Sequence, residues 1–288
     1  MKIIRFLIML LLPLCCKEFV SANNLDSIGS TQFCCIYQHY VRTTTLDDEA
    51  VIDSTITILE VGDNIAKYGD YSAYQGQKPS GYSCGFADGD PRMNDVIAVY
   101  QDFPQKGKVT VREGLLPNFY IYEEQLGLDW NLVEGQDTIL GYKCDKAIVK
   151  YGGRTWLVYY TGEIPAVYGP WKLLGLPGLI LKAESEDGIH KFVAQVLFNI
   201  EAQKITFDKM NKDVIVKRGK FISLRNRLKT DKRWAKNAGY YINKTDIKSL
   251  TIHRENNKAG LAPGMNINGI NLPISGGFEH LYKPLELK

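Results

Sequence analysis

Two predicted β-hairpins in the middle of the chain restrict its fold more than any other feature. Residues 142–161, YKCDKAIVKYGGRTWLVYYT, hold two β-branched and aromatic runs on either side of Gly152 and Gly153. Residues 179–199, LILKAESEDGIHKFVAQVLFN, repeat the pattern around Asp187 and Gly188. Gly-Gly and Asp-Gly pairs favour two-residue hairpin turns because they tolerate positive φ. Several positions are apolar on both faces of a strand, which predicts the centre of a sheet that is covered on two sides.

The flanking segments extend this pattern and add a helix. Residues 34–60, 108–113 and 118–124 are further strand candidates. Residues 217–236 place Phe221, Leu224 and Leu228 at helical spacing, with basic residues on the other face. That basic face fits either a solvated surface or contact with anionic lipid headgroups. The predicted fold class is mainly β, a curved antiparallel sheet of hairpins with one or two short helices.

The first 22 residues have the features of a secretory signal peptide. Lys2 and Arg5 precede an apolar run over residues 6–16, and small residues end the segment at Ala22. Cleavage after Ala22 leaves a single domain over residues 23–288, with an irregular tail from about residue 255 to 288. A lipid on Cys15 or Cys16 is a rival interpretation. A membrane anchor is another, although eleven apolar residues are fewer than the roughly 20 that span a bilayer. We therefore expect export to the periplasm, the cell envelope or the medium, with no transmembrane segment in the mature chain.

The charge of the mature chain argues against nucleic acid as a partner. The full sequence has 35 basic and 32 acidic residues. Removing residues 1–22 takes away three basic residues and one acidic residue, which leaves 32 and 31. A nearly neutral domain lacks the strongly basic balance that is typical of nucleic-acid-binding domains.

The cysteines of the mature chain suggest a disulfide. They are Cys34, Cys35, Cys84 and Cys144. Exported proteins meet an oxidising compartment, where disulfides form. Adjacent strand residues point to opposite faces, so a bond between Cys34 and Cys35 would be strained. We expect a bridge from one of these two to Cys84 or Cys144, and the same geometry disfavours a metal site.

Residues 168–185, YGPWKLLGLPGLILKAES, concentrate glycine, proline and leucine in a short stretch. Pro170 fits the start of a one-turn helix over residues 171–174, and Gly175 fits the left-handed position after it. Pro177 and Gly178 fit the middle of a type II turn over residues 176–179. The leucines and Ile180 fit a core. We therefore interpret this stretch as a structural element and not as a reactive site.

The same stretch carries a family resemblance. The sequence resembles the GLPGLI family of exported proteins from Gram-negative bacteria, through its hexapeptide at residues 175–180 and through residues 58–74, 139–181 and 282–287. The family-motif positions are Gly169, Pro170, Trp171, Gly175, Leu176, Pro177, Gly178, Leu179 and Ile180. The resemblance implies an exported, β-rich domain and names no reaction. The long hairpins also resemble the curved sheet of periplasmic lipoprotein carriers, a likeness of fold alone.

The sequence offers no recognisable catalytic machinery. It contains no H-E-x-x-H, no Walker loop and no G-x-G-x-x-G after a strand, so we assign no catalytic residue, metal ligand or cofactor. Ser83 in GYSCG lies between loop-like segments, whereas a nucleophile elbow needs a strand before it and a helix after it. We expect a non-enzymatic protein that uses its sheet to bind a peptide, a lipid or an envelope protein. The alternative is a secreted hydrolase with a polar site built from carboxylates such as Asp145, Glu163, Glu184 and Asp187.

Overall fold

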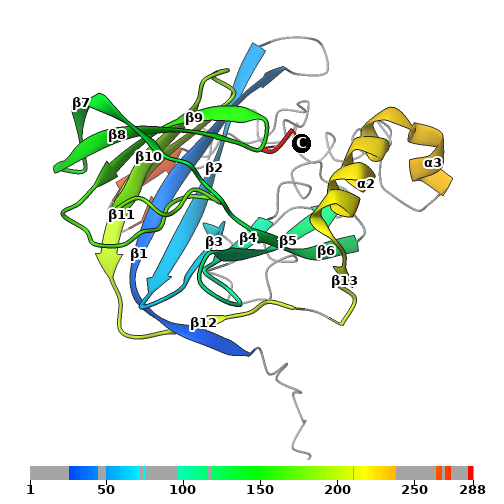
Figure 1. Cartoon of the computed structure of the whole chain (residues 1–288), viewed down its shortest axis with the longest axis horizontal. Coiled ribbons are helices and arrows are strands. Elements are labelled where there is room, and N and C mark those ends of the chain that lie inside the picture. Colours follow the sequence, from blue (N-terminus) through cyan, green and yellow to red (C-terminus); the bar gives the residue numbers. More distant parts are fainter. Residues whose placement is uncertain are drawn as a thin grey trace, which may run out of the picture.

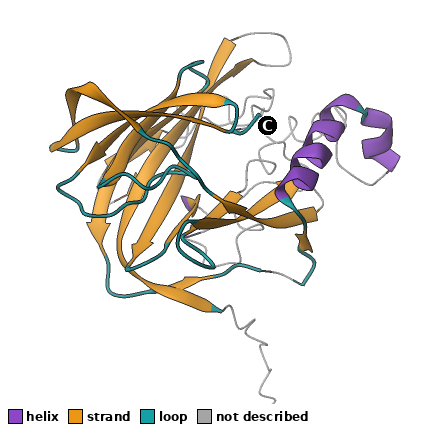
Figure 2. Ribbon diagram, in the orientation of Figure 1, coloured by secondary structure: helices purple, strands orange, loops and turns teal. Residues whose placement is uncertain are grey.

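A large curved antiparallel sheet forms most of the computed structural model (Figures 1 and 2). The structure describes residues 26–44, 50–71, 74, 97–115, 118–209, 211–237, 264–267, 270–273 and 285–287. The strand order is β13-β6-β5-β4-β3-β2-β1-β11-β10-β9-β8-β7, and β12 also pairs with β1. Among the described strands, only the pairing of β13 with β6 is parallel, and β14 and β15 form a separate hairpin. This architecture confirms the predicted mainly β fold class.

The strands follow the order of the chain closely. Their bounds are β1 Ser27–Thr44, β2 Ala50–Gly62, β3 Ala66–Asp70, β4 Ile97–Gln101, β5 Lys108–Leu115, β6 Asn118–Gln125, β7 Asn131–Ile139, β8 Tyr142–Tyr151, β9 Arg154–Thr161, β10 Leu179–Ser185, β11 His190–Asn199, β12 Lys204–Thr206, β13 Val214–Ile215, β14 Gly264–Ile267 and β15 Ile270–Pro273. Both predicted central hairpins form, β8 with β9 through the two-residue turn Gly152-Gly153 and β10 with β11 through a longer turn over residues 186–189. Gly152, Gly153 and Gly188 have positive φ at their turns, which is why glycine is needed there.

Two helices, α2 Arg218–Thr230 and α3 Lys232–Asn237, lie beside the β6 end of the sheet (Figure 1). The apolar face of α2 packs on the sheet through Phe221, whose ring stacks on Tyr122 at 5.1 Å between centroids. Arg112 of β5 holds the strand before α2, because its guanidinium binds both carboxylate oxygens of Asp213 at 2.7 and 3.0 Å. The predicted amphipathic helix is therefore present, as a pair of helices. No helix among the described residues is long and apolar enough to cross a membrane.

The two faces of the sheet bury separate apolar clusters. Cys35 and Tyr37 face the main core, whereas Cys34 and Ile36 face a smaller cluster on the opposite side. This alternation follows from the two-residue period of a strand. It places the adjacent cysteines back to back, as the sequence predicted.

Residues 162–178, between β9 and β10, fill the concave side of the sheet. The Gln101 side chain of β4 donates hydrogen bonds of 2.7 Å to the carbonyls of Gly169 and Trp171. The Trp171 ring also packs on Trp156 of β9. Five other strands separate β4 from β9 within the sheet order, so this segment contacts both strands only because the sheet curves around it. Among the described residues, this segment and the apolar side of α2 close the main core.

Candidate functional site

The turn at Pro170 differs from the predicted short helix. Leu173 N donates to Pro170 O at 3.1 Å, which closes a single turn, and Trp171 has a φ of 55°. A left-handed residue ends helical geometry, so the prediction of a helical turn over residues 171–174 was wrong. The packing explains the difference: the Trp171 ring inserts between Tyr151 and Trp156, and its carbonyl is held by Gln101.

The glycines of the hexapeptide have distinct roles. Gly175 has a φ of 96°, as expected for a left-handed position. Gly178 is not the third residue of a type II turn, because it lacks positive φ and its N–H donates to Leu176 O at 2.8 Å, closing a tighter turn around Pro177. A Cβ at Gly178 would lie 2.1 Å from Thr161 O. Glycine is required there by close backbone contact and not by its φ.

The remaining family-motif positions lie around this turn. Gly169 is also constrained by contact, since a Cβ there would lie 2.7 Å from Leu173 O. Leu176, Leu179 and Ile180 are buried in the main core, while Pro177 is exposed. The Ile180 carbonyl accepts a 2.7 Å hydrogen bond from Tyr37 OH on β1. These contacts agree with a structural role for the motif, which remains a prediction.

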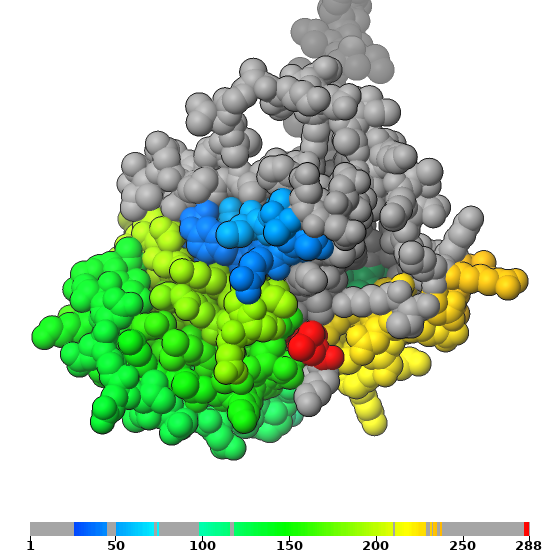
Figure 3. Space-filling view, turned by 90° about the horizontal axis from the view of Figure 1, so that it is seen from above, coloured from blue at the N-terminus to red at the C-terminus, as the bar shows by residue number. Residues whose placement is uncertain are grey.

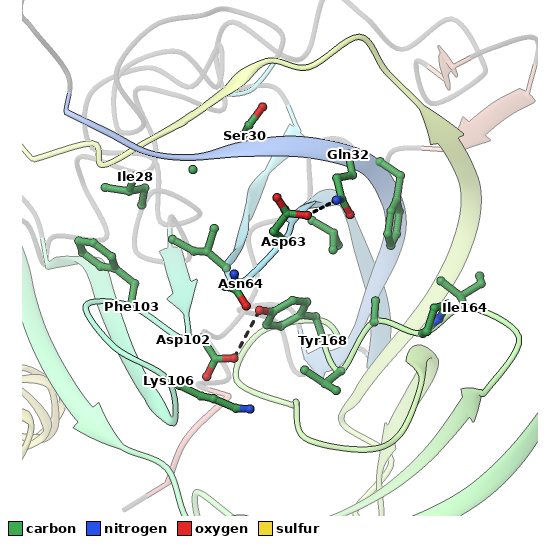
Figure 4. A pocket seen from close by; sticks show the side chains of 18 of the residues that line it. Ile28, Ser30, Gln32, Asp63, Asn64, Asp102, Phe103, Lys106, Ile164 and Tyr168 are labelled. Carbon is green, nitrogen blue, oxygen red and sulfur yellow. Dashed lines mark hydrogen bonds between the residues drawn. The ribbon is translucent and has the colours of Figure 1, made fainter.

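An open cavity of about 1180 Å³ lies where this segment meets the sheet (Figure 4). Its wall comes from the start of β1, the β2–β3 turn, the β4–β5 loop and residues 163–168. Figure 4 shows Asn64 and the Tyr168 hydroxyl between Asp63 and Asp102 in that view. Apolar side chains alternate with these polar groups, among them Ile28, Phe103 and Ile164. Such a mixture of apolar surface and few polar groups is typical of ligand-binding cavities.

Each carboxylate at the cavity is held by a donor from the protein. Asp102 accepts hydrogen bonds from Gly107 N at 2.7 Å and from Tyr168 OH at 3.3 Å. Asp63 accepts one from the Gln32 amide. Glu163 accepts one from Lys143 N at 3.0 Å. These bonds orient the acceptors before any ligand arrives.

The four carboxylates proposed for a hydrolytic site are engaged separately. Only Glu163 lines the cavity. Asp145 accepts a hydrogen bond from Gln136 on the outer strand β7, and Glu184 pairs with Lys182 at 2.7 Å. Asp187, in the β10–β11 turn, pairs with Arg154. The hydrogen bonds of the described residues therefore do not link these carboxylates into one pair.

Cys34, Cys35 and Cys144 are free, buried thiols. Desolvation is the largest cause that raises the pKa of Cys34 and Cys35 to about 12 and that of Cys144 to about 11. The predicted bridge through Cys144 is therefore not formed, since Cys34, Cys35 and Cys144 are all free thiols. A bridge through Cys84 lies outside the described residues, as do residues 1–25 and Ser83. No group of potential metal ligands occurs in the described part of the chain.

Sequence reasoning missed a buried ionic cluster next to the motif. The Lys172 side chain is fully buried, and its ammonium lies 2.9 Å from a Glu124 oxygen and 3.3 Å from a Glu286 oxygen. It also lies over the Tyr122 ring, at 5.0 Å from the centroid. The available signal was a lysine between Trp171 and Leu173 in an otherwise apolar segment.

Comparison with known proteins shows little similarity. No family model matches the chain, and no curated protein matches it. Two solved structures of PNGF-II, in space groups P21 and C2, resemble it with TM-scores of 0.48 and 0.47 at 14% and 15% identity. The matches cover 67% of this chain and 33% and 32% of those chains, so this chain spans about a third of the length of PNGF-II.

Proposed function

We propose that this chain is an exported binding protein of the GLPGLI type, without catalytic activity, and that it holds its ligand in the cavity of about 1180 Å³. One observation carries the proposal: a preformed cavity of mixed polarity whose carboxylates are already oriented by hydrogen bonds from the protein. Its volume exceeds that of most small-molecule pockets, so it suits a ligand of several linked units.

The lining also narrows the chemistry of the ligand. The lining contains three carboxylates, those of Asp63, Asp102 and Glu163, and one ammonium group, that of Lys106. This excess of negative charge and hydrogen-bond acceptors favours a neutral or basic ligand with several donors. It disfavours an anionic lipid headgroup in this cavity. The residues lining it, and not the outer face of the sheet, are the proposed binding surface.

Filling the cavity tests the proposal. Val167 lines it with 38% of its surface exposed, and Val214 lies outside it with 39% exposed. We expect Val167→Trp to block binding and the matched Val214→Trp variant to bind like wild type. The measurement is the ligand-induced rise in melting temperature with basic peptides, neutral oligosaccharides and phosphatidylglycerol vesicles, since a ligand that binds only the folded state stabilises it.

Two results would contradict this function. In the first, none of these ligands raises the melting temperature of wild type, or one of them raises the melting temperatures of wild type, Val167→Trp and Val214→Trp equally. In the second, mass spectrometry detects cleavage of a panel member by wild type but not by Val167→Trp. That second result would identify the cavity as the site of a hydrolase.

A further inference from the structure

The last described residues, 285–287, lie in a groove between the β8–β9 turn and helix α2. Figure 1 places the C-terminal end of the chain between these elements, and Figure 3 shows the same residues in red between the green hairpins and the yellow helix. They form no strand with the sheet. Leu285 packs on the main core, whereas Leu287 remains 48% exposed.

The groove binds the main chain of all three residues. Arg154 Nε donates to Leu285 O at 3.2 Å, and the Arg225 guanidinium donates to Glu286 O. Leu287 N donates to Gly152 O at 2.6 Å. Main-chain hydrogen bonds of this kind give affinity in peptide-recognition sites, where side-chain pockets supply specificity.

The side chain of Glu286 enters a basic pocket below this main chain. Its carboxylate lies 2.5 Å from a terminal nitrogen of Arg218, 3.3 Å from Lys172 Nζ and 3.3 Å from Tyr151 OH. Only 2% of Glu286 is exposed. Gly152 admits it, because a Cβ there would lie 3.1 Å from Glu286 Cγ.

The charge balance of the pocket depends on this carboxylate. The cluster consists of three cations and three carboxylates: Lys172, Arg218 and Arg225 with Glu113, Glu124 and Glu286. Without Glu286, three cations would face two carboxylates at a largely buried site. A buried charge that loses its partner is strongly destabilised. The pocket therefore selects an acidic side chain at this position.

We infer that the groove is a peptide-recognition site for an acidic residue in an extended, leucine-flanked segment, and that residues 285–287 are its resident ligand. The groove supplies three main-chain hydrogen bonds, an apolar contact for the residue before the acid, and a basic pocket for the acid itself. This site is independent of the cavity at Asp63 and Asp102, and a failure of either proposal leaves the other standing.

A nicked full-length chain tests the inference. A protease recognition sequence is inserted after Gly276, and the purified protein is cut there. We expect the tail peptide to stay with the body through gel filtration and to exchange with a labelled peptide of residues 282–288. A peptide with glutamine in place of Glu286 should bind at least roughly 30-fold more weakly, because it lacks the buried charge.

Two uncut variants serve as controls for the binding of the labelled peptide. Uncut Glu286→Gln protein should bind the labelled wild-type peptide, because its own tail is weakened. Uncut Glu184→Gln protein, changed at a surface ion pair, should not bind it. The inference is overturned if nicking unfolds the body, if the tail dissociates at once, or if the glutamate and glutamine peptides bind equally well.

Discussion

At the scale of single residues, Gly178 is constrained by backbone that has no room to move. Because a Cβ there would lie 2.1 Å from Thr161 O and 2.5 Å from Thr161 C, we expect Gly178→Ala to lower the free energy of unfolding by about 3 kcal/mol. Gly219→Ala is the control, since a Cβ there would meet no atom of the rest of the protein within 4 Å, and Gly219 lies in α2, where alanine is favoured. Urea denaturation measures both. Wild-type stability with loss of ligand binding would make the hexapeptide a binding site instead.

Glu60 gives the protein a pH dependence opposite to that of most carboxylates. Burial raises the pKa of Glu60 to about 7; Lys67 lowers it and Asp208 raises it to a smaller extent. Between pH 4.5 and 7 the folded state therefore binds more protons than the unfolded state. The free energy of unfolding contributed by this group falls as the pH rises through that window.

Replacing the Glu60 carboxylate should remove this loss of stability with rising pH. We expect Glu60→Gln to be more stable than wild type at pH 8, by up to about 3 kcal/mol, and to differ little at pH 4. Glu184→Gln is the control, because the contribution of Glu184 to stability changes with pH in the opposite direction. Although burial opposes the shift, Lys182 lowers the pKa of Glu184, so its contribution to stability is lost as the pH falls. Parallel stability profiles of Glu60→Gln and wild type between pH 4 and 8 would refute the assignment.

At the scale of elements, the Phe221 side chain packs α2 on the sheet. This ring is fully buried and contacts both Tyr120 and Tyr122 of β6. We expect Phe221→Ala to lower the free energy of unfolding by about 3–5 kcal/mol, whereas Lys220→Ala on the exposed face should change it by less than about 0.5 kcal/mol. Chemical denaturation followed by circular dichroism measures the effect. Equal stability of the two variants would show that other contacts hold the helix.

The elements that the sequence predicted are those with local causes. The β8–β9 and β10–β11 turns follow from glycines next to alternating apolar residues, and α2 follows from its spacing of Phe221, Leu224 and Leu228. The predictions that were wrong concern residues whose conformation depends on contacts far away in the sequence. Trp171 takes a positive φ because side chains from β4 and β9 fix its carbonyl and ring, and no local pattern reports such contacts.

The same distinction explains what was missed at the two candidate sites. The cavity joins the start of β1 with the β4–β5 loop and residues 163–168, which lie more than 60 residues further along the chain. The ionic cluster joins Lys172 to Glu286, which are 114 residues apart. A charged residue usually marks a surface, and only its distant partners make burial acceptable. Neither site can therefore be predicted from a short stretch of the sequence.

At the scale of the whole molecule, export is the prediction that decides where the cavity acts. The basic start, the apolar run over residues 6–16 and the small residues before Asn23 lead us to expect a mature chain that begins at Asn23. N-terminal sequencing of protein from the cell envelope or the medium measures this. Retention of Met1, or a lipid on Cys15 or Cys16, would contradict it.

The position of β1 in the sheet determines the order in which the chain can fold. This strand pairs on one side with β2, which follows it directly, and on the other side with β11, where Phe33 meets Asn199 and Val41 meets His190. Chains emerge from the ribosome N-terminus first, at about 5–20 residues per second. One long edge of β1 therefore lacks its pairing strand until nearly 200 residues have been synthesised. Pairings so distant are slow to form and leave strands open to aggregation. A partner that covers this edge of β1 until β11 is synthesised would raise the yield of folded protein without altering the stability of the finished sheet.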